Sequence, residues 1–352
     1  MQRKLSFVQA INEAMHDAMA VDPNVICYGL GVDDPKAIFG TTKGLKERFG
    51  AERVWDMPTS ENAMTGVAIG AALQGLRPVM VHQRLDFFLL AMDQLVNNAA
   101  KWHYMFGGQR SVPITIRLIL GRGWGQGPTH SQSLHAWFAH VPGLKVVMPT
   151  TPEDAKGLLF SSIFDPNPVL FFEHRWLHNS VGHVPEGEFH IPLGKARLLA
   201  EGKDLTVVAM SFMVVEALHA ADYLKDAGIS CDLLDLRTIN PIDWEAIKAS
   251  VRKTGRLLVL DTGSLTGSVA GEIVARIATE CWDDLKTAPS RIAMPDIPEP
   301  TSFSMTKGLH PRAEVIVQEI GRMLCKEVST GPLLSLRTYP HDVPGDWFTG
   351  PF

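Results

Sequence analysis

The chain has 352 residues, of which 45% are hydrophobic and 20% charged, and its formal net charge is −5. This length and composition are typical of a globular protein with two domains, and a mildly acidic chain without a basic block is not expected to bind nucleic acid. No apolar run approaches the roughly 18 residues that a membrane span needs, and the N-terminal segment lacks the features of a signal peptide, so we expect a cytoplasmic protein without a membrane partner.

The first half of the chain alternates between short apolar runs and helical patterns. After an amphipathic helix over residues 1–19, the pattern predicts strands at 25–30, 53–58, 77–83, 113–120, 144–149 and 168–174, and helices at 60–75, 86–104, 131–140 and 152–164. Such alternation is typical of a mostly parallel sheet with helices on both faces. We therefore predict an α/β domain over residues 1–180.

The second half repeats this organisation after a break. Residues 181–200 are rich in Gly, Pro and His without a sustained period, and we interpret them as a linker. The following pattern predicts strands at 205–211, 230–239 and 256–263, and helices at 213–228, 243–251, 268–282 and 312–324. It indicates a second α/β domain over residues 201–330 with a mostly parallel sheet and three layers like the first, followed by an extended tail over residues 331–352.

Common motifs for nucleotides and metals are missing from the chain. Neither GxGxxG nor GxxxxGK[ST] occurs, and no Gly-Asp-Gly is followed by an asparagine about thirty residues later. His130, His135 and His140 are five residues apart, which distributes them around a helix instead of placing them on one face. The glycine-rich loop 121–127 either lets a ligand approach the backbone closely or is an ordinary irregular loop.

The cysteines also lack a recognisable pattern. Their spacing matches no zinc or redox motif, and their neighbours are apolar, so we expect all four to be reduced and buried: Cys27, Cys231, Cys281 and Cys325.

Two longer segments resemble one protein family. MPTSENAMTGVAIGAALQGLRPV (57–79) and GQGPTHSQSLHAWFAHVPGLKVVMPTTPEDAKGLLFSSIFDPNPVLFFEH (125–174) are similar to the β subunits of thiamine-diphosphate-dependent 2-oxoacid dehydrogenases, which act on pyruvate, branched-chain oxoacids or acetoin. Further similarity at 91–108, 235–243 and 294–300 keeps the order of that family. The resemblance implies a transketolase-like pyrimidine-binding domain followed by a domain like the transketolase C-terminal domain.

Within this resemblance, Glu61 matches a glutamate that faces a ring nitrogen of the aminopyrimidine of the cofactor, with Ser60 beside it. A carboxyl group among small and apolar residues can hold or share a proton near neutral pH, as this contact requires. The residues alone favour a structural explanation of Glu61, as an acid in the first turn of a helix or as part of a capping box near Thr59 and Ser60.

Two further residues match the family's active site. Phe87 corresponds to the aromatic residue that stacks on the pyrimidine, and His130 corresponds to a catalytic histidine at the mouth of the site that takes part in acyl transfer. By residue type alone, a phenylalanine in an apolar run and a lone histidine are more often structural.

Four positions near these residues depart from the family pattern. Arg84 and Asp86 replace a softer segment, and they either line a changed substrate pocket or pair with each other on the surface. Thr129 and His135 stand where the family commonly has glutamine and glutamate. We expect these two to bear on the substrate or the acyl acceptor.

The resemblance also implies ions and a partner. Backbone carbonyls near Ile163, Asp165 and Asn167 match a potassium site of the family, although a turn between two prolines explains the same residues without an ion. In this superfamily a Gly-Asp-Gly motif with its asparagine holds Mg²⁺ and the diphosphate. Since this chain lacks the motif, the resemblance implies a separate α subunit that holds Mg²⁺ and shares thiamine diphosphate with this chain in an α2β2 heterotetramer.

The leading hypothesis is a β subunit that activates the cofactor for decarboxylation of a 2-oxoacid and acyl transfer to lipoamide, with a lipoyl acyltransferase as a candidate partner. One alternative keeps the cofactor and passes the acyl group to an aldehyde or sugar, which would make the protein a carboligase. The other is a scaffold subunit without catalytic activity.

Overall fold

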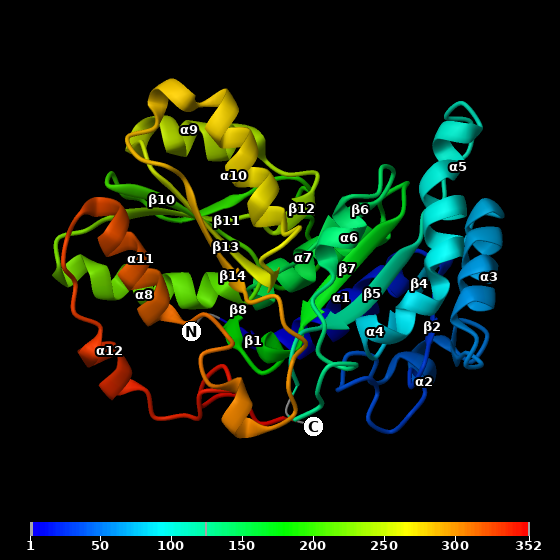
Figure 1. Ribbon diagram of the computed structural model, residues 1–352. Helices are drawn as coiled ribbons and strands as arrows, with labels where there is room; N and C mark the ends of the chain where they lie inside the picture. The colour runs from blue at the N-terminus through cyan, green and yellow to red at the C-terminus, as the bar shows by residue number, and fades with distance from the viewer. Residues whose placement is uncertain (1–2, 124, 351–352) are drawn as a thin grey trace.

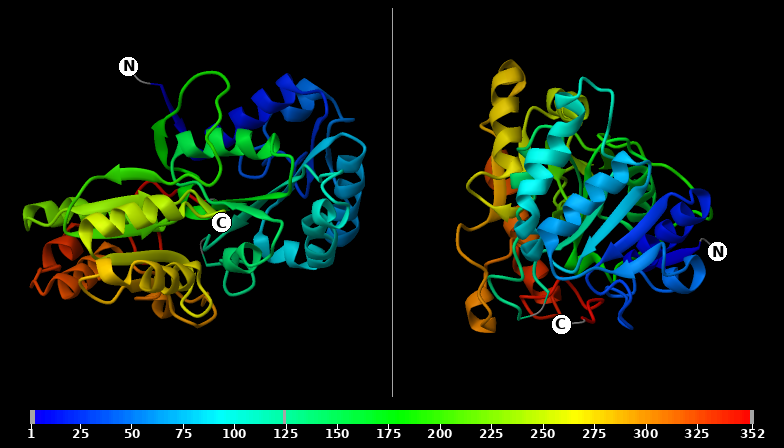
Figure 2. Two further views of the ribbon diagram at one scale, coloured as in Figure 1. Left: turned by 90° about the horizontal axis from the view of Figure 1, so that it is seen from above. Right: turned by 90° about the vertical axis from the view of Figure 1, so that its right-hand side faces the viewer.

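The computed structural model describes residues 3–123 and 125–350, so Trp124 of the glycine-rich loop and both chain ends lie outside the described residues. The described residues form two α/β units side by side, one from each half of the chain (Figure 1). Seen from above, the first-half elements in blue and cyan lie to one side and the yellow-to-red elements to the other (Figure 2). The predicted α/β fold with two mostly parallel sheets is confirmed.

The first unit is built on a sheet with the order β12-β6-β7-β5-β4-β2-β3, in which every described pair except β12–β6 is parallel. Its strands are β2 (Val25–Gly29), β3 (Val54–Asp56), β4 (Arg77–His82), β5 (Thr115–Leu120), β6 (Lys145–Val147), β7 (Val169–His174) and β12 (Thr238–Asn240). Helices cover both faces, and burial on both sides explains why the central strands are continuous apolar runs.

The helices of this unit divide between the two faces of the sheet. On one face α1 and α7 pack together, and on the other lie α3, α4, η1, η2 and α6. Their bounds are α1 (Phe7–Val21), α2 (Leu45–Phe49), α3 (Glu61–Leu73), α4 (Leu85–Phe88), the 3₁₀ turn η1 (Leu89–Ala91), the π-helix η2 (Gln94–Ala99), α5 (Ala100–Met105), α6 (His135–Ala139), α7 (Pro152–Ile163) and the 3₁₀ turn η3 (Arg175–Leu177).

Two helix predictions in this unit were partly wrong. The helix predicted over 86–104 is the series α4, η1, η2 and α5, and polar side chains within it, such as Asn97 and Asp93, bond to one another along the π-helix. The helix predicted over 131–140 shortens to α6. Residues before α6 are held in another conformation because the carbonyl of Gln132 accepts a hydrogen bond from Gly121 N.

The second unit has a sheet of order β14-β13-β10-β11-β9 that is parallel except for β9 at its edge. Its strands are β9 (Arg197–Ala200), β10 (Leu205–Ala209), β11 (Cys231–Asp235), β13 (Leu257–Ser264) and β14 (Ser290–Met294). Helices α8 (Met213–Asp226) and α11 (Ala313–Leu324) cover one face, and α9 (Trp244–Thr254) and α10 (Val269–Glu280) cover the other. The short 3₁₀ turns are η4 (Trp282–Asp284) and η5 (Phe303–Thr306).

The strand predicted over 230–239 is divided between the two sheets. Arg237 has a φ of 57°, a left-handed conformation that ends β11, and the next residues form β12 and pair antiparallel with β6 of the first sheet. The expected linker also contains strands, because β8 (Val181–His183) pairs with β1 (Lys4–Ser6) and β9 closes the edge of the second sheet. Strand β14 was not predicted.

The tail beyond residue 330 is not simply extended. It starts with α12 (Gly331–Leu336), which has no buried residue, and then returns as irregular chain to the first unit, where Asp342 is buried. The domain boundaries expected from the sequence remain a prediction.

Cys27, Cys231 and Cys281 are buried free thiols, and burial raises the pKa of Cys27 and Cys231 to about 12. The prediction was wrong for Cys325, which ends α11 in a left-handed conformation and is exposed. No helix within residues 3–123 and 125–350 is both long enough and apolar enough to span a lipid bilayer.

Candidate active site

Four neighbouring strands of the first sheet, β3, β2, β4 and β5, are parallel, so their carboxyl ends lie on the same side of the sheet. The chain passes from β2 to β3 on one side and then returns to β4 and β5 on the other, so the strand order reverses between β2 and β4. Ligands of open parallel sheets bind at such a reversal. Gly29 at the end of β2 is needed there, because a Cβ on it would lie 2.0 Å from the carbonyl oxygen of Val81 on β4.

The predicted site residues follow these strands in turn. Glu61 comes after β3, Phe87 after β4 and His130 after β5. Since parallel strands carry their carboxyl ends to one edge, the fold places all three residues on loops or helix starts around the same reversal.

Glu61 is the first residue of α3 and is only 5% exposed. Its carboxylate forms no hydrogen bond or ion pair with any residue that the structure describes, and its backbone carbonyl accepts the hydroxyl of Thr65 at 2.8 Å. Ser60 is the N-cap residue, but its side chain makes no capping hydrogen bond. The capping-box interpretation was therefore wrong, and a largely buried carboxylate at the start of a helix retains its full bonding capacity.

Phe87 and His130 are brought into contact. Their ring centroids are 5.4 Å apart with the planes at 85°, an edge-to-face pair in which both rings stay partly exposed. Thr129 Oγ1 lies 3.0 Å from Nδ1 of His130. Among the described residues, none forms a hydrogen bond with Nε2 of His130.

Arg84 does not lie on the surface. It is buried at the start of α4 and donates to the carbonyl of Gly121 at 3.1 Å and to Oε1 of Gln126, and burial lowers its pKa to about 10. The guanidinium thus holds the glycine-rich loop against the first unit.

Asp86 bonds to the other end of the same loop. Its Oδ1 accepts Nε2 of Gln132 at 2.7 Å, and burial raises the pKa of the carboxyl although this hydrogen bond opposes the change. Arg84 and Asp86 therefore do not pair with each other on the surface, as one alternative held, and both fix the segment 121–132 that carries His130.

His135 was expected near the substrate, and that expectation was wrong. It is fully buried in α6, with Nε2 2.8 Å from Oδ1 of Asp261 on β13 of the second unit. Burial acts to raise the pKa of Asp261, but the contact with His135 and the amides of Gly263 and Ala270 outweigh it and lower that pKa. The His135–Asp261 pair joins the two units.

Asp261 was missed by the sequence analysis. A signal was present, because an acid directly after the apolar strand residues Leu257–Leu260 is unusual unless it has a partner. Thr129, by contrast, is exposed and lines a cavity of about 440 Å³ between the units, together with Gln132, Thr262, Asp296 and Glu299.

The expected potassium loop already contacts a cationic side chain. Arg77 Nη1 lies 3.2 Å from the carbonyl oxygen of Ile163 and 3.5 Å from that of Asp165. The Asp165 carboxylate accepts a hydrogen bond from the backbone amide of Asn167 at 2.9 Å, which is the bond of an Asx turn. The same carboxylate forms an ion pair with Lys145. The carbonyl oxygens of Ile163 and Asp165 have second lone pairs, and a cation would have to share these atoms with Arg77.

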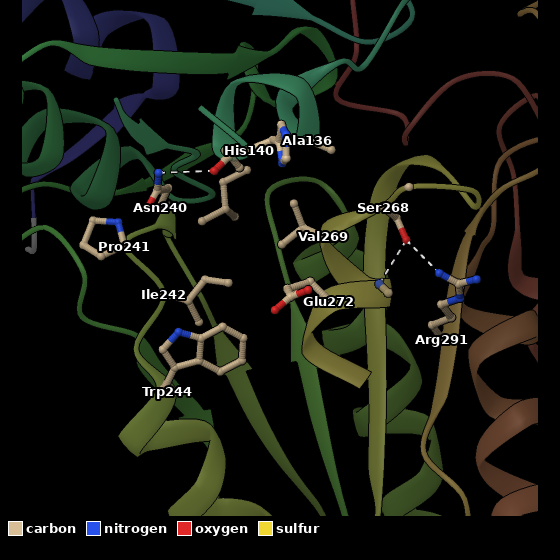
Figure 3. A pocket seen from close by; sticks show the side chains of 14 residues that line it. Ala136, His140, Asn240, Pro241, Ile242, Trp244, Ser268, Val269, Glu272 and Arg291 are labelled. Carbon is tan, nitrogen blue, oxygen red and sulfur yellow. Dashed lines mark hydrogen bonds between the residues drawn. The ribbon is translucent and has the colours of Figure 1, made fainter. Parts of the chain in front are cut away.

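Another cavity, of about 740 Å³, lies between α6, the turn from β12 to α9 and the start of α10 (Figure 3). His140, Trp244 and Glu272 line it, and Arg291 donates to Ser268 Oγ at its rim. None of the residues that the sequence predicted for the active site lines this cavity.

The fold and the site together define a transketolase-like protein. The family model "Transketolase, pyrimidine binding domain" matches residues 3–180 and "Transketolase, C-terminal domain" matches residues 194–316. The structure is similar to a solved split-gene transketolase described as an inactive beta4 tetramer, with a TM-score of 0.73 and 20% identity over 92% of this chain and 99% of that one.

Sequence comparison narrows this class. The chain is 43% identical to the β subunit of acetoin:2,6-dichlorophenolindophenol oxidoreductase of Cupriavidus necator, over 90% of this chain and 96% of the relative. It is 43% identical to the 2-oxoisovalerate dehydrogenase β subunit of Bacillus subtilis, over 84% and 90%, and 40% identical to a rice mitochondrial pyruvate dehydrogenase E1 subunit beta-2, over 93% and 88%. The chain belongs to the β subunits of thiamine-dependent 2-oxoacid dehydrogenase E1 components, as its sequence predicted.

Proposed function

We propose that this chain is the β half of an E1 component that decarboxylates a 2-oxoacid and passes the acyl group to lipoamide. The observation that carries the proposal is Glu61, a largely buried carboxylate without a partner among the described residues, at the start of α3 beside the reversal of strand order. A structural acid at this depth would be expected to have a partner within the chain.

The described side chains fit the aminopyrimidine of thiamine diphosphate. Phe87 offers a partly exposed flat ring, and Glu61 offers an acceptor or a proton to a ring nitrogen. When bound, the cofactor supplies the nucleophilic carbon for the reaction. Glu61 would manage a proton on the pyrimidine, Phe87 would fix the plane of the ring, and Ser60 would lie beside them.

His130 has a different task at the mouth of the site. Its edge-to-face contact with Phe87 and its contact with Thr129 orient the imidazole, so that Nε2 is available to the substrate. An imidazole can give and take a proton at working pH, which suits a group that assists acyl transfer.

The proposal assigns the other half of the site to a partner. The relatives named above are β subunits, and this chain lacks the Gly-Asp-Gly motif, so we place Mg²⁺ and the diphosphate on an α subunit within an α2β2 heterotetramer. A lipoyl acyltransferase as acceptor partner, a cytoplasmic location and a potassium ion at Ile163, Asp165 and Asn167 are further parts of the proposal. The potassium ion has the least support, because Arg77 contacts two of the three carbonyl groups.

The carboligase alternative has lost most of its motivation. It was motivated by Arg84, Asp86, Thr129 and His135 as altered substrate contacts. Of these, Arg84, Asp86 and His135 instead hold a loop and join the two units, and only Thr129 lines a cavity. The scaffold alternative predicts that changes at Glu61 leave the activity of the assembled complex intact.

The proposal is tested by co-expressing the chain with an α-type subunit, purifying the complex, and screening 2-oxoacids for CO₂ release. Free lipoamide and aldehydes are then compared as acceptors. We expect CO₂ release that depends on both subunits and transfer to lipoamide but not to aldehydes. Transfer to aldehydes only would establish the carboligase, and tight binding of thiamine diphosphate and Mg²⁺ by the chain without a partner would end the division between subunits.

A further inference from the structure

The loop that follows β5 is held by residues distant in sequence. Arg122, the second residue of the glycine-rich loop, is 2% exposed and forms two ion pairs. Nη1 donates to Oε1 of Glu299 at 3.1 Å, and Nη2 donates to Oδ2 of Asp342 at 3.1 Å. Nη1 also donates to the carbonyl of Pro300 at 2.9 Å.

The two acids come from different parts of the second half of the chain. Glu299 is buried in the segment after β14, and His310 Nε2 lies 2.9 Å from its Oε1. Asp342 is buried in the tail, 220 residues from Arg122 along the chain. Figure 1 shows this red tail running back beneath the second unit towards the first.

Other contacts determine the course of the tail on both sides of Asp342. Before it, Arg337 forms a two-bond ion pair with Glu314 of α11. At Asp342 itself, Arg312 Nη2 donates to the flanking carbonyls of His341 and Val343 at 3.1 and 2.7 Å. The backbone around Asp342 is therefore fixed by α11 and its N-cap residue, whereas its carboxylate points to the loop.

After Asp342 the tail is connected to the loop a second time, through Trp176 of η3. Trp347 Nε1 donates to the carbonyl of Trp176 at 3.5 Å, and Trp176 Nε1 donates to the carbonyl of Gly123 at 3.4 Å. Gly127 lies against Thr301, where a Cβ on the glycine would be 2.3 Å from Oγ1. Together these contacts hold the segment 299–301 and the tail against the loop, and the contact of Thr301 with Gly127 lies three residues before His130.

The tail lies outside the part of the chain that the transketolase models match, which ends at residue 316. The contact between the tail and the loop is thus an addition to the two matched domains. The loop it contacts also contains His130, a proposed active-site residue.

We propose that the tail segment 337–348 is a strap that, through Asp342 and Arg122, positions the described loop residues 121–123 and 125–130 and thereby His130 against Phe87. This inference rests on the proposed function for the role of His130, but the strap itself is independent of it. Asp342 touches neither Phe87 nor His130 in the described structure, so it is a positioning residue. Its effect passes through a buried, directional ion pair, which tolerates little displacement.

The strap is tested in the complete complex with Asp342→Asn and the matched control Asp346→Asn. Asp346 lies in the same tail, is exposed, and accepts a hydrogen bond from Thr338 in that tail. For Asp342→Asn we expect kcat to fall about tenfold with KM for the 2-oxoacid changed by less than about twofold, because His130 is displaced while the site is still formed. The limb of the pH–rate profile that is lost in His130→Gln should also shift. The control should match wild type in both.

A second readout does not need turnover. In protein labelled at histidine Cε1, the His130 resonance is assigned from its loss in His130→Gln. We expect Asp342→Asn to move this resonance and its titration, and Asp346→Asn to leave them unchanged. If Asp342→Asn moves the His130 resonance but the wild-type complex shows no activity on any 2-oxoacid, the proposed function is refuted and the strap stands. An unmoved resonance in an active complex would refute the strap only.

A purely structural role for the tail is distinguishable. If Asp342→Asn lowers the melting temperature but leaves kcat, the pH profile and the His130 resonance as in wild type, the strap is wrong. Should this variant fail to fold, the pair Arg122→Gln with Asp342→Asn removes both charges of this ion pair at once, while Glu299 keeps its contact with His310. The strap predicts the same loss of kcat and the same moved resonance for the pair, and wild-type values for the pair would overturn it.

Discussion

The two sides of the proposed site are built differently. Glu61 stands at the start of α3 without a side-chain partner among the described residues, and the outer face of the helix at Val67 and Gly70 is exposed. The loop with His130 is bonded from within the chain by Arg84 and Arg122.

This difference shows which half of the site the chain completes by itself. Buried ion pairs and hydrogen bonds give the loop after β5 a defined geometry before any ligand binds. The carboxylate of Glu61 has no partner among the described residues, and in the proposed function the cofactor supplies one. An acid kept without a partner at that depth is expected where function requires it. The predictions below test this contrast, from the largest expected effect to the smallest.

Glu61→Ala should lower turnover of the assembled complex about 1,000-fold, within the range for loss of a proton-transfer group, and should leave assembly intact. CO₂ release and size-exclusion chromatography measure the two effects. Glu47→Ala is the matched control, because Glu47 is an exposed acid in the first turn of α2, and it should keep wild-type turnover. Turnover near wild type in Glu61→Ala would support the scaffold alternative. It would also mean that the missing side-chain partner of Glu61 has no functional significance.

Asp261→Ala should destabilise the protein by about 3 kcal/mol, since it leaves His135 and two backbone amides without their buried partner. A thermal melt of the purified chain measures the loss. Asp296→Ala is the control, because Asp296 is exposed and bonds only to Thr266 at the surface among the described side chains. Equal melting temperatures in both variants would show that the His135–Asp261 pair does not hold the units together.

Asp235 gives a pH-dependent prediction. It is the last residue of β11, just before the chain crosses to β12 of the first sheet. It is buried, and burial together with the nearby Asp154 raises its pKa to about 7, above its ordinary value of 3.8. As pH rises from 3.8 to 7, the unfolded state loses the proton while the folded state still holds it, so this group lowers stability across that window.

Asp235→Asn removes this dependence. The free energy of unfolding of the variant minus that of wild type should therefore increase from pH 5 to pH 8, by an amount on the order of 2 kcal/mol, and the difference in melting temperature should increase with it. A difference that is constant between these two pH values would mean that Asp235 does not titrate in this range.

Potassium should have the smallest effect. In wild type, replacing NaCl by KCl at equal ionic strength should raise the melting temperature only slightly, because Arg77 already contacts the carbonyls of Ile163 and Asp165. Arg77→Ala should make the rise specific to potassium larger, since the carbonyls are then without their cationic partner. Identical curves in the two salts for both proteins would exclude the ion.

Several parts of the fold and the site were accessible from the sequence. The hydrophobic period and the turn residues between apolar runs predicted the alternating strands and helices of both units. The resemblance to the family pointed to Glu61, Phe87 and His130. Phe87 and His130 are in contact, although their catalytic roles remain a proposal. The surface pairing suggested for Arg84 and the substrate role suggested for His135 were wrong because the partners of these residues, Gln126 and Asp261, come from other elements.

By itself, then, the sequence determined the α/β class, the alternation of most strands and helices, and the family, since hydrophobic period, turn residues and motifs act over short stretches of chain. Only the tertiary structure decided that β12 joins the first sheet and that Asp342 reaches Arg122. These pairings join segments that are distant in the chain. They form only when the two units pack together, and a local sequence pattern contains no information about that packing.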